Sequence, residues 1–311
     1  MHSLVLLLLS GLFLSPSSGH AFGEASATGV LIGETREEPS VPTAGFAVIG
    51  DAGYWNSSTR QVRDSIHRAS VRHLVLPGDN LYNPLSSYEA VWTPWRELGF
   101  LFQVVAFGNH HGGYDVEARY FDMPGAAYSQ VYGQDLRFLV LNSNTKRDIE
   151  VQARWFEEQL QTAQETFVVP VFHHPPLTVS SLHGWQEREA FHRQIRPLIL
   201  KYRDRITTLL VGHDHLAALY SIEGIPMILS GATHDTRDAE TRNEVQEGLR
   251  LRTHWMFDEK PYWVRLRLPR GSKVTSELEA DFIRATDDRL RCSVVLRTGA
   301  PAAPKANCAA E

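Results

Sequence analysis

The sequence predicts an α/β domain whose strands carry polar side chains at their ends. Short apolar runs alternate with segments of helical spacing, and the runs at 46–49 and 74–76 enclose a helix predicted at 58–69 to form a βαβ unit. Several apolar runs end in Gly followed by Asp, Asn or His. The chain has 311 residues, 43% of them hydrophobic, which is enough for one large α/β domain or two small ones. We place a single domain at residues 44–300.

The N-terminal residues predict a secretory signal peptide. Residues 5–14 form an apolar core that is too short to span a bilayer, and small residues follow it. We expect the signal peptide to cover residues 1–21, with cleavage as late as 27, although an uncleaved anchor is the alternative. Residues 22–43 read as a linker and 301–311 as a tail. We therefore expect a secreted or periplasmic (lumenal) protein without stable membrane insertion after signal removal.

Charge and special residues narrow the function. A net charge of −5 argues against nucleic-acid binding, which would need a basic surface. Fourteen His are many for this length, and imidazole is the commonest metal ligand. The two cysteines, Cys292 and Cys308, could form a disulfide in an oxidising compartment and fix the C-terminal tail. Such a disulfide would raise the free energy of unfolding by about 3 kcal/mol.

The elements follow one another in a regular order. A helical spacing of apolar residues, such as Phe191, Ile195 and Leu198, predicts each helix, and Pro197 should kink or restart the last one. Helices are predicted at 58–69, near 88–95, at 149–163 and at 186–201. Strands are predicted at 46–49, 74–76, 102–107, 136–141, 167–172, 206–211, 217–222 and 226–230. Beyond residue 240, charged alternating segments at 263–268, 278–283 and 294–296 suggest edge strands of a second sheet.

Polar side chains gather at five predicted strand ends. The ends of parallel strands are where ligands bind in α/β sheets. Oxygen donors and imidazoles without thiolate suit Fe, Mn or Zn. Seven donors are too many for one tetrahedral ion, but they suit two ions bridged by a carboxylate. Taken singly, each residue could instead cap a helix or shape a turn. The seven candidate ligands are Asp51, Asp79, Tyr82, Asn109, His173, His213 and His215.

The order of these motifs resembles that of the calcineurin-like metallophosphoesterases, and within them the short, tartrate-resistant-type purple acid phosphatases. The similarity spans roughly residues 46–235. It implies an α/β fold with four layers, an α/β/β/α sandwich of two mixed β-sheets flanked by helices. The motifs that carry it are Gly50-Asp51-Ala52-Gly53, Gly78-Asp79-Asn80-Leu81-Tyr82, Gly108-Asn109-His110, His173-His174-Pro175 and Gly212-His213-Asp214-His215.

The resemblance also implies a role for each ligand. Most metallophosphoesterases carry a metal-binding His where this chain has Gly53, and in purple acid phosphatases a tyrosinate replaces it, here Tyr82. Fe(III) would bind the first group of ligands, a divalent metal (Fe, Zn or Mn) would bind the second, and Asp79 would bridge them. The first group is Asp51, Tyr82 and His215, and the second is Asn109, His173 and His213.

Four more histidines are candidates for contact with substrate. His110 matches the family residue that contacts substrate or protonates the leaving group. The others flank the motifs and are weaker candidates for substrate binding: His111, His174 and His234.

The function implied is a secreted acid phosphatase that hydrolyses phosphomonoesters by attack of a metal-bound hydroxide. A phosphodiesterase or nucleotide pyrophosphatase could use the same centre, because the outer loops at 112–128 and 178–185 would select the ester. A protein that binds metal or phosphate without catalysis is the third hypothesis. The sequence does not predict the oligomeric state.

Overall fold

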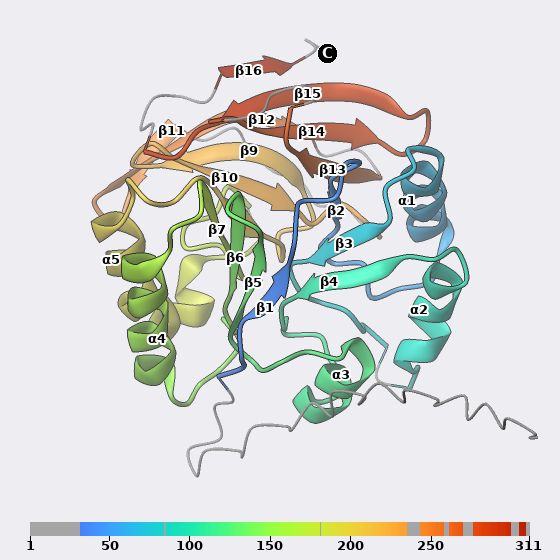
Figure 1. Cartoon of the computed structure of the whole chain (residues 1–311), viewed down its shortest axis with the longest axis horizontal. Coiled ribbons are helices and arrows are strands. Elements are labelled where there is room, and N and C mark those ends of the chain that lie inside the picture. Colours follow the sequence, from blue (N-terminus) through green and yellow to red (C-terminus); the bar gives the residue numbers. More distant parts are fainter. Residues whose placement is uncertain are drawn as a thin grey trace, which may run out of the picture.

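Two mixed β-sheets pack face to face in the computed structural model (Figure 1). The structure describes residues 32–83, 85–180, 182–234, 243–257, 261–269, 276–299 and 305–308, so the predicted signal peptide lies outside the described residues. None of the helices in these segments is both long and apolar enough to cross a membrane.

The smaller sheet has seven strands in the order β16-β15-β14-β13-β2-β3-β4. Its strands β2, β3 and β4 run parallel, and the others are antiparallel. The strand bounds are β2 (Phe46–Val48), β3 (His73–Leu76), β4 (Leu101–Val105), β13 (Tyr262–Arg267), β14 (Leu278–Arg284), β15 (Arg289–Leu296) and β16 (Lys305–Cys308).

The larger sheet has nine strands in the order β1-β5-β6-β7-β8-β10-β9-β12-β11. Strands β6, β7, β8 and β10 are parallel neighbours at its centre. The bounds are β1 (Arg36–Glu38), β5 (Tyr128–Tyr132), β6 (Leu136–Val140), β7 (Phe167–Val171), β8 (Leu209–Val211), β9 (Ala217–Ile222), β10 (Ile225–Ser230), β11 (Asn243–Gln246) and β12 (Leu249–Phe257).

Helices form the two outer layers. Helices α1 (Ser57–Arg68) and α2 (Tyr88–Arg96) lie beside the seven-stranded sheet, and α4 (Ile149–Thr162) and α5 (Glu189–Lys201) lie beside the nine-stranded sheet (Figure 1). Two shorter helices, α3 (Tyr114–Phe121) and the 3₁₀ helix η1 (Trp185–Arg188), stand in the loops. The four-layer α/β/β/α fold predicted from the motifs is confirmed.

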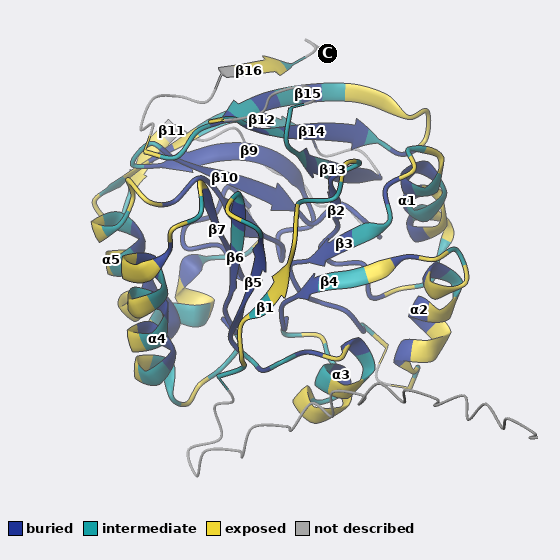
Figure 2. Cartoon of the chain, viewed as in Figure 1, coloured by how far each residue is buried: buried dark blue, intermediate teal, exposed yellow. Residues whose placement is uncertain are grey.

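Apolar periodicity and capping explain why these helices form. In α1, the side chain of Asn56 accepts the N–H of Thr59 at 3.0 Å, and the Thr59 hydroxyl accepts the N–H of Asn56 at 2.9 Å. Val62 and Ile66, one turn apart, are fully buried on the inner face of the helix. Figure 2 shows the same division in other helices, with buried residues facing the sheets and exposed ones facing outward.

The core has two parts, one on each side of the nine-stranded sheet. The first fills the space between the sheets and beneath α1 and α2, and includes Trp92, Trp95 and Phe138. The second lies between the nine-stranded sheet and α4 and α5, and includes Phe156 and Phe191. Side chains on alternating strand positions therefore belong to different cores, as Phe138 and Leu139 on β6 show.

The segments beyond residue 240 correct one prediction. None of the three predicted edge strands lies at an edge, because each has a neighbour on both sides. Strand β13 pairs with β2 and β14, β14 pairs with β13 and β15, and β15 pairs with β14 and β16. The charged residues of β13 suggested an edge, but they pair across strands: Arg265 Nη2 lies 2.7 Å from Asp281 Oδ2 on β14. The alternating charged residues of β13 therefore serve in ion pairs with the neighbouring strand and do not indicate an exposed edge.

Several element boundaries also differ from the predictions; strand β4, for example, ends at Val105 and not at 107. Strand β8 begins at Leu209, not at 206. Helix α5 continues through Pro197, so the predicted restart is not observed, and η1 precedes it. Within the predicted linker and tail, β1 pairs with β5 and β16 pairs with β15, so these short segments complete the sheets. Their shortness and polar composition gave no periodic signal.

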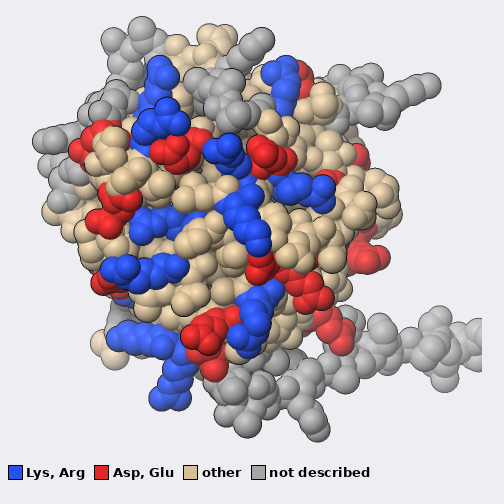
Figure 3. All heavy atoms as spheres, turned by 90° about the vertical axis from the view of Figure 1, so that its left-hand side faces the viewer, with Lys and Arg blue, Asp and Glu red and all other residues tan. Residues whose placement is uncertain are grey.

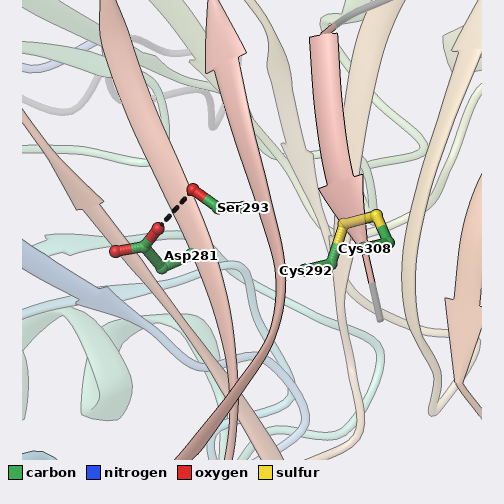
Figure 4. The surroundings of a disulfide bond; sticks show 4 residues. All are labelled: Asp281, Cys292, Ser293 and Cys308. Carbon is green, nitrogen blue, oxygen red and sulfur yellow. Dashed lines mark hydrogen bonds between the residues drawn. A yellow bond between two sulfur atoms is a disulfide. The ribbon is translucent and has the colours of Figure 1, made fainter. Parts of the chain in front are cut away.

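The two cysteines form a disulfide between neighbouring strands. Cys292 on β15 and Cys308 on β16 are Cα partners in the sheet, 16 residues apart in sequence (Figure 4). Nearby, the Ser293 hydroxyl donates to Asp281 Oδ1 at 2.7 Å. The disulfide thus fixes the last described strand to the sheet.

The face of the molecule over α4 and α5 carries both signs of charge. Basic and acidic side chains are interspersed on this face (Figure 3). Lys201 Nζ on α5 lies 2.7 Å from Glu157 Oε1 on α4, an exposed pair that contributes little to stability.

The ion pair between Arg137 and Glu165 predicts a pH-dependent stability. Their guanidinium and carboxylate make two contacts of 2.8 Å, and both side chains are largely buried. Burial favours the neutral carboxyl, but Arg137 outweighs it and holds the pKa of Glu165 below its ordinary value of 4.5. The stabilisation is therefore present above pH 4.5 and is lost as the pH falls through the folded-state pKa.

We expect Glu165→Gln to lower the free energy of unfolding by about 1–3 kcal/mol at pH 7. The difference from the wild type should shrink as the pH falls below the ordinary Glu pKa. Urea denaturation at a series of pH values measures it, with the exposed Glu158→Gln as the control. A deficit in Glu165→Gln that stays constant across this pH range would contradict the account.

Candidate metal centre

Four of the predicted ligands have an unusual backbone conformation. Asp51, Asp79, His213 and His215 have positive φ angles of 55°, 58°, 76° and 52°. Few residues other than Gly adopt this left-handed region, and those that do are often found at functional sites. The residues follow β2, β3 and β8, where the parallel strands of both sheets end.

Three side chains form the first half of the site. The Tyr82 hydroxyl donates to Asp51 Oδ1 at 2.9 Å and lies 2.8 Å from His215 Nε2. His215 Nε2 is itself 3.5 Å from Asp51 Oδ1. These are the three residues for which the family resemblance implies Fe(III) binding, and the structure brings them together.

Three further side chains form the second half. His173 Nε2 lies 3.2 Å from Asp79 Oδ1 and 3.1 Å from Asn109 Oδ1. His173 Nδ1 donates to the carbonyl oxygen of Pro77 at 3.0 Å, so in neutral His173 the Nε2 atom carries a lone pair. A lone pair and two oxygen acceptors then face one another, an arrangement that a proton or a metal ion between them would stabilise.

The two halves lie next to each other. Ligand atoms of Asp51, Asp79 and His173 are all within 4.8 Å of one another. The loops are also joined through the backbone, because the N–H of Asp51 donates to the carbonyl of Gly78 at 3.0 Å, and the N–H of His213 donates to Asp51 Oδ2 at 2.9 Å. Asp79 thus lies where a bridging carboxylate would be needed.

Gly53 and Gly108 allow this close approach. A Cβ on Gly53 would lie 2.4 Å from the backbone nitrogen of Leu81, and one on Gly108 would lie 2.1 Å from Asp79 Oδ1. A side chain at position 53 therefore cannot fit without moving the loop that carries Asp79 and Tyr82. This crowding gives a physical reason why the chain has Gly where most metallophosphoesterases have His.

The electrostatics of the site favour cations. Burial raises the pKa of Asp51 to about 8, although His173 opposes the shift, and Asp79 adds to it. Burial and both carboxylates also raise the pKa of Tyr82 well above 10.0. Burial opposes charge on His173, but Asp79 outweighs it and raises the pKa of His173 to about 9. Two buried carboxylates, a phenol and imidazoles therefore fit metal ions, which would replace these protons.

His213 has a different environment from the other predicted ligands. Its Nε2 atom lies 3.1 Å from Glu187 Oε2, and its ring centroid is 5.0 Å from that of His173 and 4.4 Å from that of His174. It is 5% exposed and within reach of the second half of the site, but it faces η1.

The four histidines that are candidates for contact with substrate lie in different surroundings. His110 is exposed, and its ring centroid lies 4.5 Å from that of Tyr82. His234 also lies against Tyr82, with centroids 4.3 Å apart. His174 is buried among the imidazoles of the second half. His111 stacks instead on Tyr114, with ring centroids 4.4 Å apart.

A buried network beneath the site was missed by sequence reasoning. Glu117, on α3, accepts the side-chain N–H of Asn80 at 2.7 Å and the hydroxyl of Tyr88 at 2.8 Å. Tyr88 in turn accepts the N–H of Gly112 at 3.0 Å. The network thus ties the loop of Asp79 to the loop of Asn109 and His110. Glu117 carried no motif, because its partners are distant in sequence.

Glu187 was also missed, and His183 was not among the predicted site residues. The His-x-x-x-Glu spacing would have placed them on one side of a helical turn. Their partner His213, however, is 26 residues beyond Glu187.

Comparisons with known proteins support the resemblance. No family model matches the chain. Tartrate-resistant acid phosphatase type 5 of Homo sapiens is 33% identical over 99 residues, which are 30% of this chain and 29% of the human protein. The protein of the same name from Rattus norvegicus is 34% identical over 90 residues, 28% of this chain and 26% of the rat protein. The chain thus matches less than a third of the length of these relatives.

Solved structures show the same fold. The purple acid phosphatase PPD1 of yellow lupin (Lupinus luteus) has a TM-score of 0.60 and 14% identity, covering 83% of this chain and 54% of that one. GAP50, the anchor in the inner membrane complex of Plasmodium, has a TM-score of 0.62 and 12% identity, covering 81% and 88%. The resemblance to metallophosphoesterases is therefore confirmed, and at these identities the structural likeness shows the fold alone.

We expect Glu117→Ala to lower the free energy of unfolding by about 2–4 kcal/mol, because it leaves Tyr88 and one N–H of Asn80 without their acceptor. Glu117→Gln should lose much less, because its amide can accept from Asn80 and donate to Tyr88. Chemical denaturation of both variants measures the difference. Equal losses in the two variants would show that the network does not act through these hydrogen bonds.

Proposed function

We propose that the protein is a secreted, metal-dependent phosphatase that hydrolyses phosphomonoesters at a two-ion centre. The observation that carries the proposal is the convergence of donors from both sheets around Asp79. Loops after β2, β3, β4, β7 and β8 bring carboxylate, phenol, amide and imidazole groups together at distances of 2.8–3.5 Å.

Each of the two ligand groups would bind one of the two ions, as the family resemblance implies. Asp51, Tyr82 and His215 offer a hard, anionic set that suits Fe(III), and Asp79 would bridge. The second set offers one amide oxygen and imidazole nitrogens, which suits Fe, Zn or Mn as a divalent ion. His213 would complete this second set with Asn109 and His173.

The chain's own residues would orient the ester and move the proton. When bound, a two-ion pair activates water and stabilises the attacking and leaving oxygens of an in-line displacement. The exposed imidazole of His110 stands beside Tyr82, where it can donate a proton to the leaving oxygen as a general acid. The N–H of His110 also holds Asp79 Oδ1 at 2.8 Å, so the same residue orients the bridging carboxylate.

Two features support an oxidising compartment outside the cytosol. The N-terminal residues predict a signal peptide, and Cys292 and Cys308 form a disulfide. Both fit a secreted or lumenal enzyme.

A second candidate is a protein that binds metal or phosphate without catalysis. The likeness to GAP50, which is named as an anchor, favours this possibility. The exposed His110 beside a complete donor set argues for catalysis, because a metal-binding role alone does not need it.

Phosphate release from p-nitrophenyl phosphate tests the phosphatase proposal. We expect turnover by the protein with its metals and a loss of about 100-fold or more in Asp79→Asn, because the ions supply several kcal/mol of transition-state stabilisation. The control is Asp122→Asn, an exposed carboxylate that pairs with Arg36. Faster turnover of the bis-ester would favour a diesterase, and no turnover of either ester with full metal content would favour the non-catalytic protein.

The visible spectrum tests the Tyr82 assignment without relying on activity. A phenolate on Fe(III) should produce a charge-transfer band in the purified protein, and Tyr82→Phe should lose it. Tyr54→Phe is the matched control, because the Tyr54 ring stacks on Tyr82 at 5.1 Å but belongs to neither ligand group. An iron-loaded Tyr82→Phe protein that keeps the band would rule out the assignment.

A further inference from the structure

A second group of metal-binding side chains lies beside the proposed two-ion centre. His183 Nδ1 is 2.9 Å from Glu187 Oε1, and His213 Nε2 is 3.1 Å from Glu187 Oε2. One ligand atom from each of the three residues lies within 4.8 Å of the others. We call this group, His183, Glu187 and His213, the accessory site.

The donor types of the accessory site fit zinc. Two imidazoles and one carboxylate are a ligand set of zinc sites that keep an open position. Zinc–ligand bonds of about 2.0–2.2 Å place tetrahedral ligands roughly 3.3–3.5 Å apart, so the observed separations need only small movements. The imidazoles of His183 and His213 are also close, with ring centroids 4.2 Å apart.

The charges around the group are compatible with a cation. The carboxylate of Glu187 is the acidic group of the accessory site, and its two oxygens face the imidazoles of His183 and His213. The neighbouring Arg188 donates through Nη2 to Asn144 Oδ1 at 2.6 Å and through Nη1 to the backbone carbonyl of Glu187 at 2.7 Å, so its hydrogen bonds do not occupy the Glu187 carboxylate.

His213 belongs to two donor groups at once. Its ligand atoms lie within 4.8 Å of those of His173 and His174 as well as those of the accessory site. A neutral imidazole has a single ring lone pair, on the nitrogen that carries no hydrogen, so His213 can bind only one ion at a time. An ion in the accessory site would therefore take His213 away from the second ion of the main centre.

His174 lies on the other side of His213. Its Nδ1 lies 2.8 Å from the Ser143 hydroxyl, which fixes the ring, while its buried Nε2 has no hydrogen-bond partner among the described residues. A hydrogen bond to one ring nitrogen commonly orients the other nitrogen toward a metal. His174 therefore adjoins His213 but belongs to neither of the proposed ligand sets.

We propose that His183, Glu187 and His213 form an accessory site for a divalent, zinc-like ion, which competes with the two-ion centre for His213. Excess zinc would fill the accessory site and inhibit the enzyme. The inhibition rests on the proposed phosphatase function, whereas binding of the additional ion does not.

Equilibrium dialysis of the metal-free full chain against Zn²⁺, followed by metal analysis, tests the site directly. We expect the wild type to bind one further, weaker Zn²⁺ per chain after the main centre is filled. Glu187→Gln and His183→Gln should weaken this ion by at least about tenfold, the lower end of the loss seen when even an outer partner of a ligand is removed. The control is Glu189→Gln, whose carboxylate pairs with Arg193 and not with His213.

Either of two results would overturn the accessory site: the wild type binds no further ion, or the further ion binds equally tightly in both variants.

Inhibition is then measured with p-nitrophenyl phosphate, relative to each variant's own activity at limiting Zn²⁺. Wild type and Glu189→Gln should lose activity over the range in which the further ion binds, and Glu187→Gln should resist. Unchanged inhibition in Glu187→Gln would refute the competition for His213. If no variant turns over substrate, the phosphatase proposal fails, while dialysis still decides the accessory site.

Discussion

The burial of Asp51 and Asp79 between the two sheets is the constraint on which the site depends. Both carboxylates are at most 1% exposed, and they are close enough that Asp79 raises the pKa of Asp51. Buried carboxylates are stable only when they are protonated, paired or bound to metal. Close to these two carboxylates lie a phenol and imidazoles, which are side-chain types that can bind metal ions. The same burial that would destabilise an empty cluster thus favours its occupation by cations.

The fold supplies this arrangement through the ends of its parallel strands. The seven-stranded sheet delivers the two carboxylates and Asn109, whereas the nine-stranded sheet delivers the imidazoles. Left-handed backbone at Asp51, Asp79, His213 and His215 turns each loop sharply after its strand. Strained conformations of this kind persist only where the surrounding structure holds them, and the Glu117 network provides such support.

Much of the site could be predicted because each ligand follows a short apolar run and a turn. The features that could not be predicted from the sequence depend on contacts between residues that are distant in the chain. The alternating charged residues of β13 predict an edge strand, but in the structure they pair with charged residues of β14. The spacing of Glu187 from His183 indicates that these two can pair, but the contact of Glu187 with His213 depends on the orientation of the His213 ring. The linker prediction missed β1 for a similar reason, since three polar residues become a strand only beside β5.

The central claim is that two metal ions lie on either side of the Asp79 carboxylate. Anomalous diffraction from crystals of the purified protein, recorded at the iron and zinc absorption edges, tests it most directly. We predict two peaks about 3.5–4 Å apart, one beside Tyr82 and His215 and the other beside Asn109 and His173. A single peak, or metal bound away from Asp79, would contradict the account.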